Sequence, residues 1–208
     1  MTVVNVLLTH FFVTAEYAMP WFPPDQYGFT DAERYDYAIA TVDALKSPTI
    51  AEDLAAIGDS AGEPIYIQRE IEHLVDVKVV IDALNRVYFA ALALFLLMVG
   101  VLTWKQEYIA LRAAFWQGAL LMILCLLGLG AYASIDFFQF FTWFHSLFFA
   151  GDTWLFRLDD SLIRLFPLRF WMDAVVLILG STFLVSLGLL FGLKPSSGVG
   201  VSTKQPNV

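Results

Sequence analysis

The sequence is poor in cysteine and in basic residues. Its 208 residues include one cysteine, Cys125, so neither a disulfide nor a thiolate metal cage can form within a single chain. Lysine and arginine total 12 against 20 acidic residues, an excess that would repel the phosphate backbone of a nucleic acid. No serine lies in a G-x-S-x-G turn and Cys125 lies within an apolar run, which disfavours a covalent nucleophile mechanism. Glycine-rich phosphate loops are also lacking.

Charge is missing altogether from three long apolar stretches. Residues 87–103, 113–135 and 174–193 contain no Asp, Glu, Lys or Arg, and 59% of the whole chain is hydrophobic, with a mean hydropathy of +0.68. A helix needs about 20 apolar residues to cross about 30 Å of hydrocarbon. The sequence therefore predicts an all-α membrane protein with three full transmembrane helices, at about 87–104, 113–135 and 173–193, and excludes a single water-soluble domain for the whole chain.

A fourth apolar run, residues 3–13, is too short for a crossing. It holds eleven residues, is interrupted by Asn5 and His10, and lacks the cationic flank of a signal peptide. Two interpretations stay open for residues 1–15: an interfacial segment, or a partial first transmembrane helix. The resemblance described below favours the partial helix. His10, with no acid beside it in sequence, is interpreted as an interfacial side chain.

Residues 16–85 are predicted to form a separate helical domain. Between residues 16 and 82 there are fourteen acidic and four basic residues. Thr30 with Glu33, and Thr49 with Glu52, have the spacing of capping boxes and predict the starts of two helices. From about Tyr66 the pattern is helical without a break through Asn85 and into the first span.

The short basic loops indicate the orientation in the membrane. Residues 194–208 are interpreted as a cytoplasmic tail, and the acidic domain and the connection 137–170 are expected on the extracytoplasmic side. Seven phenylalanines and a tryptophan within residues 137–149 suit the headgroup boundary. The basic residues that indicate the cytoplasmic side are Lys105, Arg112, Lys194 and Lys204.

Two histidines carry the expected chemistry. His73 and His145 are 72 positions apart, yet the predicted topology places both on the same membrane face, where we expect them to face one site. Asp76, three positions after His73 on a helix, could accept a proton from one ring nitrogen and leave the other as a base. His145 lies in an aromatic, water-poor segment, which favours the neutral imidazole. A solvated, ion-paired helix end and an interfacial anchor are the plainer interpretations of these two residues.

A metal site is a further possibility. Glu70-x-x-His73 has the i, i+3 spacing of carboxylate-bridged metal proteins, although it occurs only once in the chain. Together with His145 and Asp152 it would make a mixed ligand set. Asp136, at the end of the second span, marks either a polar cavity or a simple helix end.

Three stretches together resemble a known family. They are FPPDQYGFTDAERYDYA at 22–38, REIEHLVDVK at 69–78 and FHSLFFAGDTWLFRLDDSLIRLFP at 144–167. The chain resembles, from about residue 7 to 193, the integral membrane family that includes the lipoprotein intramolecular transacylase. The resemblance implies four spanning helices, with an extracytoplasmic domain between the first and second, so residues 3–13 would be the remnant of the first.

The resemblance also implies an activity in the cell membrane. The family moves an acyl chain from the sn-2 oxygen of a diacylglyceryl-modified cysteine to the α-amine of the same cysteine, which implies membrane lipids and diacylated lipoprotein N-termini as partners and no cofactor. Ester and amine belong to one molecule, so positioning and proton transfer can supply most of the catalysis. Under this hypothesis His73 removes the amine proton and His145 supports the tetrahedral intermediate or the leaving alkoxide. The alternatives are a metal-dependent hydrolase using Glu70, His73, His145 and Asp152, and a non-enzymatic scaffold. The residues that match the motif around the two family histidines are Arg69, Glu70, Asp76, Lys78, Asp152 and Trp154.

Overall fold

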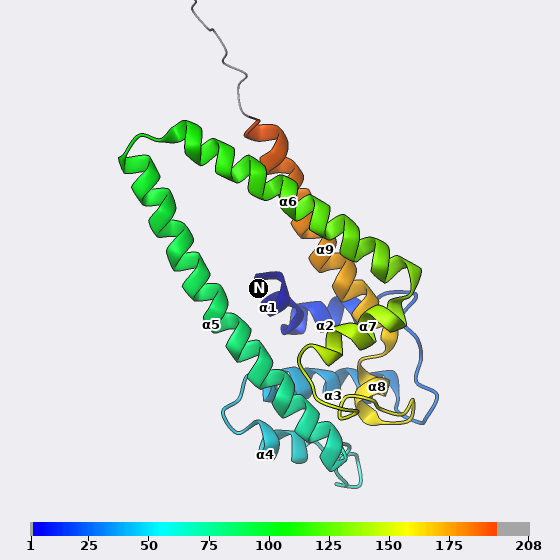
Figure 1. The fold of residues 1–208 in the computed structure, drawn as a ribbon. Coiled ribbons are helices and arrows are strands. Elements are labelled where there is room, and N and C mark those ends of the chain that lie inside the picture. Colours follow the sequence, from blue (N-terminus) through cyan, green and yellow to red (C-terminus); the bar gives the residue numbers. More distant parts are fainter. Residues whose placement is uncertain (1, 195–208) are drawn as a thin grey trace, which may run out of the picture.

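A computed structural model describes residues 2–194, and its regular structure is helical (Figure 1). One isolated bridge pairs Gly58 with Pro64, and no strand forms within the described range. The prediction of an all-α protein is therefore confirmed. Residues 195–208, with most of the predicted tail and Lys204, lie outside the described residues. The helices are α1 (Thr2–Leu7), α2 (His10–Tyr17), α3 (Asp31–Ala44), α4 (Ile50–Ala55), α5 (Gln68–Trp104), α6 (Tyr108–Ile135), α7 (Phe137–Ser146), α8 (Ser161–Leu165) and α9 (Leu168–Gly192).

Three of these helices, α5, α6 and α9, are long and apolar enough to cross a membrane. Helix α5 is unbroken over 37 residues, so the polar segment continues into the span as predicted. Figure 1 shows α6 and α9 side by side, whereas α5 diverges from α6 after the turn that joins them. The apolar surface of α5 is exposed to the surroundings, as expected of a helix face that lipid covers.

The N-terminal apolar run forms two short helices instead of one. Thr9 interrupts the run because its hydroxyl accepts the backbone N–H of Phe12 and caps α2. Helix α1 packs on α9, and Asn5 Nδ2 donates to Asn85 Oδ1 of α5 at 3.2 Å. Figure 1 shows α1 lying between α5 and α9. The interpretation of this segment as a partial spanning helix stays a prediction.

The two predicted helix caps have different outcomes. Thr30 and Glu33 form the capping box: the Thr30 hydroxyl accepts the N–H of Glu33, and the Glu33 carboxylate accepts the N–H of Thr30. At Thr49 the second helix begins as predicted, with Ile50 as its first residue, but the capping box does not form, since the Thr49 hydroxyl caps no backbone amide and donates to the Asp53 carboxylate at 3.1 Å. The Thr49 backbone has ψ of 38° instead of the extended conformation that brings a capping hydroxyl over the first turn.

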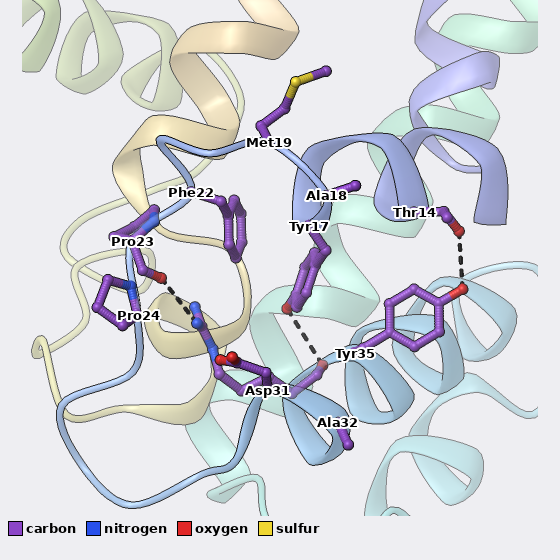
Figure 2. Close-up of a pocket in the computed structure, with 11 residues that line it drawn as sticks. Thr14, Tyr17, Ala18, Met19, Phe22, Pro23, Pro24, Asp31, Ala32 and Tyr35 are labelled. Atoms are coloured by element: carbon purple, nitrogen blue, oxygen red, sulfur yellow. Dashed lines mark hydrogen bonds between the residues drawn. The ribbon is translucent and has the colours of Figure 1, made fainter.

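Hydroxyl groups join α2 to its neighbours (Figure 2). The Thr14 and Tyr35 hydroxyls are 2.9 Å apart, and the Tyr17 hydroxyl lies within hydrogen-bond reach of the carbonyls of Arg34, at 3.3 Å, and Leu165, at 2.8 Å. These contacts connect α2 with α3 and with the end of α8. His10 of α2 also pairs with a partner: its Nε2 is 2.7 Å from the Asp43 carboxylate of α3. This acidic partner was not predicted from the sequence, and the interfacial position of His10 stays a prediction.

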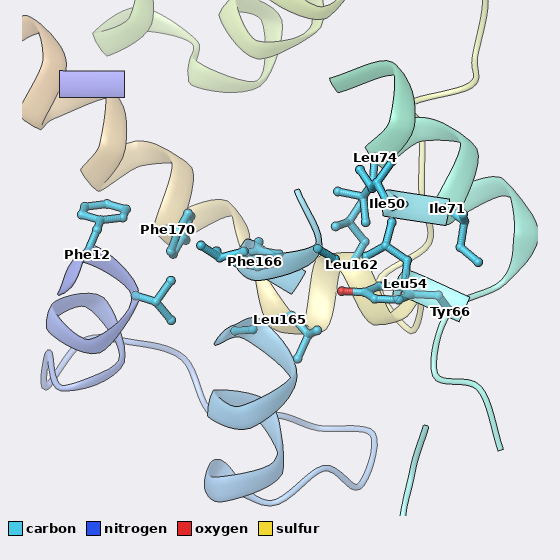
Figure 3. Close-up of a cluster of buried hydrophobic side chains, with 14 of the residues drawn as sticks. Phe12, Ile50, Leu54, Tyr66, Ile71, Leu74, Leu162, Leu165, Phe166 and Phe170 are labelled. Atoms are coloured by element: carbon cyan, nitrogen blue, oxygen red, sulfur yellow. The ribbon is translucent and has the colours of Figure 1, made fainter. Parts of the chain in front are cut away.

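A hydrophobic core holds the short helices at one end of the spans (Figure 3). Leu54 and Leu165 are completely buried in it, and each buried leucine contributes about 1.5–3 kcal/mol to folding. The core fixes the first turns of α5 against α8 and the start of α9. Its members include Phe12, Val13, Ala38, Val42, Leu54, Tyr66, Ile71, Leu74, Leu162, Leu165, Phe166 and Phe170.

Basic residues gather at the opposite end of the spans. Arg112, near the start of α6, donates from Nε to the carbonyls of Leu193 and Lys194, at the end of α9. Lys105 lies in the turn between α5 and α6. The described cations that we used to predict orientation therefore share one end of the molecule, as expected.

Candidate functional site

The first histidine, His73, lies in the polar part of α5, before the charge-free stretch. Its side chain is buried, with 6% of its surface exposed. The ring packs against two phenyl rings, Phe149 at 5.0 Å and Phe156 at 5.2 Å between centroids. Burial lowers the pKa of His73 to about 4, and the neighbouring His145 adds to the effect, so His73 is neutral at pH 7.

The second histidine, His145, lies near the end of α7 and stacks on the first. The two imidazole centroids are 6.3 Å apart, with an angle of 26° between the rings. His145 Nδ1 is 2.8 Å from the carbonyl oxygen of Phe141. A carbonyl only accepts, so Nδ1 carries the proton, and in the neutral ring Nε2 then has the free electron pair. Burial lowers the pKa of His145 as well.

Aromatic rings from two segments enclose the histidine pair. Around His145 the ring centroids lie at 4.0 Å for Phe141, 4.8 Å for Trp154 and 5.7 Å for Phe149. Trp154 is buried in the connection that follows α7. These rings replace water around both imidazoles, which keeps the imidazoles neutral and restricts their motion.

The expected pairing of His73 with Asp76 is not formed. Asp76 is exposed, and within residues 2–194 no hydrogen bond joins it to His73. His73 Nδ1 is buried and has no hydrogen-bond partner. Asp76 lies about 60° around α5 from His73, at the edge of the packed face, and its carboxylate reaches solvent there. The prediction that an aspartate favours the charged form of His73 is therefore wrong.

Glu70, one turn before His73, connects α5 to α8. It is only 1% exposed, and each carboxylate oxygen accepts one backbone N–H: Leu162 at 2.7 Å and Ile67 at 2.9 Å. Burial raises the pKa of Glu70, while these two bonds act in the opposite direction. Both oxygens are thus engaged by backbone N–H groups, so Glu70 supports the site by joining α5 to α8.

Arg69 and Ser161 hold the connection 155–161 against α5. Arg69 donates to the carbonyl of Leu155 at 2.7 Å, lies 3.5 Å from the Asp160 carboxylate, and places its guanidinium 4.9 Å from the Phe156 ring. The Ser161 hydroxyl donates to the carbonyl of Ile65. These bonds position the segment that carries the rings packed on the two histidines.

The remaining candidates lie apart from the histidines. Lys78 donates to the carbonyl of Leu45 at 3.2 Å and lies 3.3 Å from the Asp82 carboxylate. Asp152 is exposed in the turn after α7. Of the eight candidates, the structure brings together His73, His145 and Trp154, backed by Arg69 and Glu70.

The metal alternative is not supported by the geometry. Among residues 2–194, no three His, Cys, Asp or Glu side chains form a group that could hold a metal ion. The predicted set fails because the fold uses the Glu70 carboxylate and because Asp152 faces solvent. Asp136 is a helix end: its carboxylate accepts the N–H of Gln139 and caps α7.

Three phenylalanines of the site were not singled out from the sequence. Phe149 and Phe156 touch His73, and Phe141 packs on His145; all three belong to the aromatic-rich stretch that the sequence places at the headgroup boundary or just after it. Their repeated occurrence around His145 was the available signal. It did not indicate which of the many phenylalanines would turn inward.

Residues 34–171 match the family model of the lipoprotein intramolecular transacylase Lit. An uncharacterised protein of Aquifex aeolicus (strain VF5) is 30% identical over 187 residues, covering 88% of this chain and 78% of the relative. The membrane-integral lipoprotein intramolecular transacylase Lit from Bacillus cereus has the same fold, with a TM-score of 0.60 at 20% identity, over 92% of this chain and 86% of that one.

The chain belongs to the Lit family of lipoprotein intramolecular transacylases. It is therefore a membrane enzyme of the acyltransferase class, and the scaffold alternative is wrong.

Proposed function

We propose that the protein transfers an acyl chain from the sn-2 ester of a diacylglyceryl-cysteine lipoprotein to the α-amine of the same cysteine. The stacked pair of His73, which is buried, and His145, which is half-buried, lies among aromatic rings and is the observation that carries the proposal. Two neutral imidazoles side by side can accept one proton and release another within a single catalytic cycle.

The hydrogen bond to Phe141 supports a division of roles. With Nδ1 of His145 donating, Nε2 is the free base, and it would take the proton from the attacking amine. His73 would hydrogen-bond to the departing glyceryl oxygen and help return a proton to it. This assignment reverses the roles expected from the sequence, because His73 lacks the aspartate that would have made it the stronger base.

The proposed acyl transfer needs neither water nor a cofactor as a reactant. The amine nitrogen forms a bond to the ester carbonyl carbon, and the bond from that carbon to the glyceryl oxygen breaks. One proton passes from nitrogen to oxygen through the histidines. Holding ester and amine together can supply effective molarities of about 10⁵–10⁸ M, so no enzyme nucleophile is needed. The phenyl and indole rings around the pair would exclude the water that could hydrolyse the ester.

The site suits a substrate anchored in the outer leaflet. Helix α7 exposes a row of large apolar side chains next to the histidines, which favours contact with lipid. The basic end formed by Lys105, Arg112 and Lys194 would face the cytoplasm under the positive-inside rule. The acidic domain and the histidine pair would then be extracytoplasmic. The exposed apolar residues of α7 and the turn after it are Phe138, Trp143, Phe144, Leu147 and Phe148.

Mass spectrometry of lipoprotein N-termini tests the proposal in cells. Cells that carry the gene should contain lyso-lipoproteins with an N-acyl chain, and cells without it should lose that form. Expression of the parent protein should restore it, whereas equal amounts of the His73→Ala or His145→Ala variant should not. An acylation pattern that is the same with and without the gene would contradict the proposed reaction.

A further inference from the structure

A pocket lies away from the histidine pair, between α2, the loop 18–30 and α3 (Figure 2). Its volume is about 590 Å³. Aromatic side chains line it, including Tyr17, Phe22 and Tyr35. Two residues of opposite charge, Asp31 and Arg34, line the same space. The proposed acyl transfer uses none of these side chains.

Arg34 is a buried cation without a carboxylate partner. It is 2% exposed, and no ion pair to it forms within residues 2–194. Its guanidinium makes three hydrogen bonds to backbone carbonyls, two to Arg164 and one to Pro23. Since an arginine has five N–H groups, two are left for another acceptor. The Asp25 carboxylate could have neutralised the Arg34 guanidinium, but it forms an ion pair with the Arg164 side chain instead.

Asp31, on the same helix, differs from Arg34 both in the sign of its charge and in its exposure to solvent. It is exposed in the first turn of α3 and has neither a hydrogen bond nor an ion pair from its side chain in the described part of the chain. Asp31 and Arg34 are three positions apart and do not pair with each other. A ligand that carries both an anionic oxygen and an ammonium group would match the two charges at once.

Residues typical of the bilayer boundary lie beside the pocket. Trp21, in the loop that borders it, donates from Nε1 to the Asp173 carboxylate at 3.1 Å, and the Arg169 guanidinium lies 5.4 Å from the Trp21 ring. Asp173 is the last charged residue before the apolar stretch of α9, residues 174–192. Tryptophan and arginine at the end of a span are typical of the headgroup region.

We propose that this pocket binds the headgroup of an ethanolamine phospholipid. The phosphate would accept the free N–H groups of Arg34, and the ammonium would lie beside Asp31 and the ring of Tyr35. A glycerol headgroup supplies the phosphate but no ammonium, and a lysine-bearing peptide supplies an ammonium but no phosphate. Because one pocket holds both a positive and a negative side chain, it favours the zwitterionic lipid over a glycerol lipid and over a lysine-bearing peptide.

Native mass spectrometry of the detergent-purified protein tests this site. The protein is titrated with phosphatidylethanolamine and, separately, with phosphatidylglycerol that carries the same acyl chains. We expect tighter binding of phosphatidylethanolamine, and a loss of about three- to five-fold for that lipid alone in Asp31→Asn, the factor of one exposed charge pair. Asp36→Asn, an exposed carboxylate of α3 that does not line the pocket, is the control and should change neither affinity.

Reversing the charge at position 31 should increase the relative affinity for phosphatidylglycerol. Asp31→Lys should prefer phosphatidylglycerol over phosphatidylethanolamine, and such a swap cannot result from damage to the fold. Arg34 is unsuitable for the test, because truncating a buried cation with three hydrogen bonds would unfold the domain. Equal affinity of the parent for the two lipids, an unchanged affinity in Asp31→Asn, or binding of a lysine peptide in place of the lipid would each overturn the proposal.

Discussion

His145 donates a hydrogen bond from Nδ1 to the carbonyl oxygen of Phe141, four residues earlier in the same helix, at 2.8 Å. This local bond within α7 fixes both the tautomer and the direction of the ring. It leaves Nε2 as an unprotonated nitrogen next to His73, whose ring is stacked 6.3 Å away. The chemistry that we propose depends on this relationship.

Replacing His145 by Asn should separate the fold from the chemistry. An asparagine amide NH₂ is attached to Cγ, as Nδ1 is, so it can still donate to the Phe141 carbonyl, but it has no basic nitrogen. We expect the variant to fold normally and to lose about 10²–10⁴-fold in acyl transfer, as for the loss of a positioned base. Circular dichroism and a product assay by mass spectrometry measure both properties. Activity close to that of the parent would remove His145 as the base.

Burial of His73 should make stability depend on pH in a defined window. The pKa of His73 is about 4 in the folded protein and 6.5 in an exposed histidine, so the unfolded chain binds the proton first as the pH falls. The free energy of unfolding should be at its full value above pH 6.5 and fall as the pH drops from 6.5 to about 4.

His73→Phe is the matched variant for that measurement. It keeps a ring among Phe149 and Phe156 but has no proton to bind, so its stability should fall less over the same interval. Thermal unfolding in detergent at several pH values gives the comparison. An identical pH dependence in the parent and the variant would show that His73 is not buried in its neutral form.

The exposed position of Asp76 predicts that its removal is harmless. Asp76→Asn should leave the acyl-transfer rate within about two-fold of the parent, because Asp76 makes no contact with His73 and surface changes of this kind have small effects. The rate is measured on purified protein. A large loss of rate in this variant would restore Asp76 as the partner of His73 and contradict the arrangement described above.

Glu70→Gln should destabilise the protein although the side chains have the same size. Both carboxylate oxygens accept a backbone N–H, and a glutamine would point an NH₂ group at one of those donors. We expect a loss of about 1–3 kcal/mol in unfolding free energy. Glu72→Gln changes an exposed carboxylate on the same helix and should be neutral. Equal stability of the two variants would contradict the role of Glu70 in joining α5 to α8.

The helices that the sequence predicted best are those with long, unambiguous patterns. The three charge-free stretches indicate α5, α6 and α9, because few structures other than a spanning helix accommodate such runs. The capping box at Thr30 was also predictable, as both partners lie within four residues. Local signals fail where several conformations satisfy the same residues, as at Thr49, whose hydroxyl bonds a side chain instead of a backbone amide.

The candidate site also has features that could be predicted from the sequence and features that could not. The proximity of His73 and His145 could be inferred from topology, since each follows or precedes a span on the same side. The helical face of Asp76 could not, because it depends on which side of α5 packs against the connection 150–167. The pairing of His10 with Asp43, 33 positions away, likewise has no local signal.

Acyl transfer by the purified protein on a synthetic diacylglyceryl-cysteine peptide tests the central claim most directly. The peptide carries a labelled chain at the sn-2 position, and mass spectrometry follows the label. The parent protein should move it to the α-amine without releasing free fatty acid, and His73→Ala and His145→Ala should each lose about 10²–10⁴-fold in rate while remaining folded. Transfer at the parent rate by either variant, or release of the label as fatty acid, would contradict intramolecular transfer by this histidine pair.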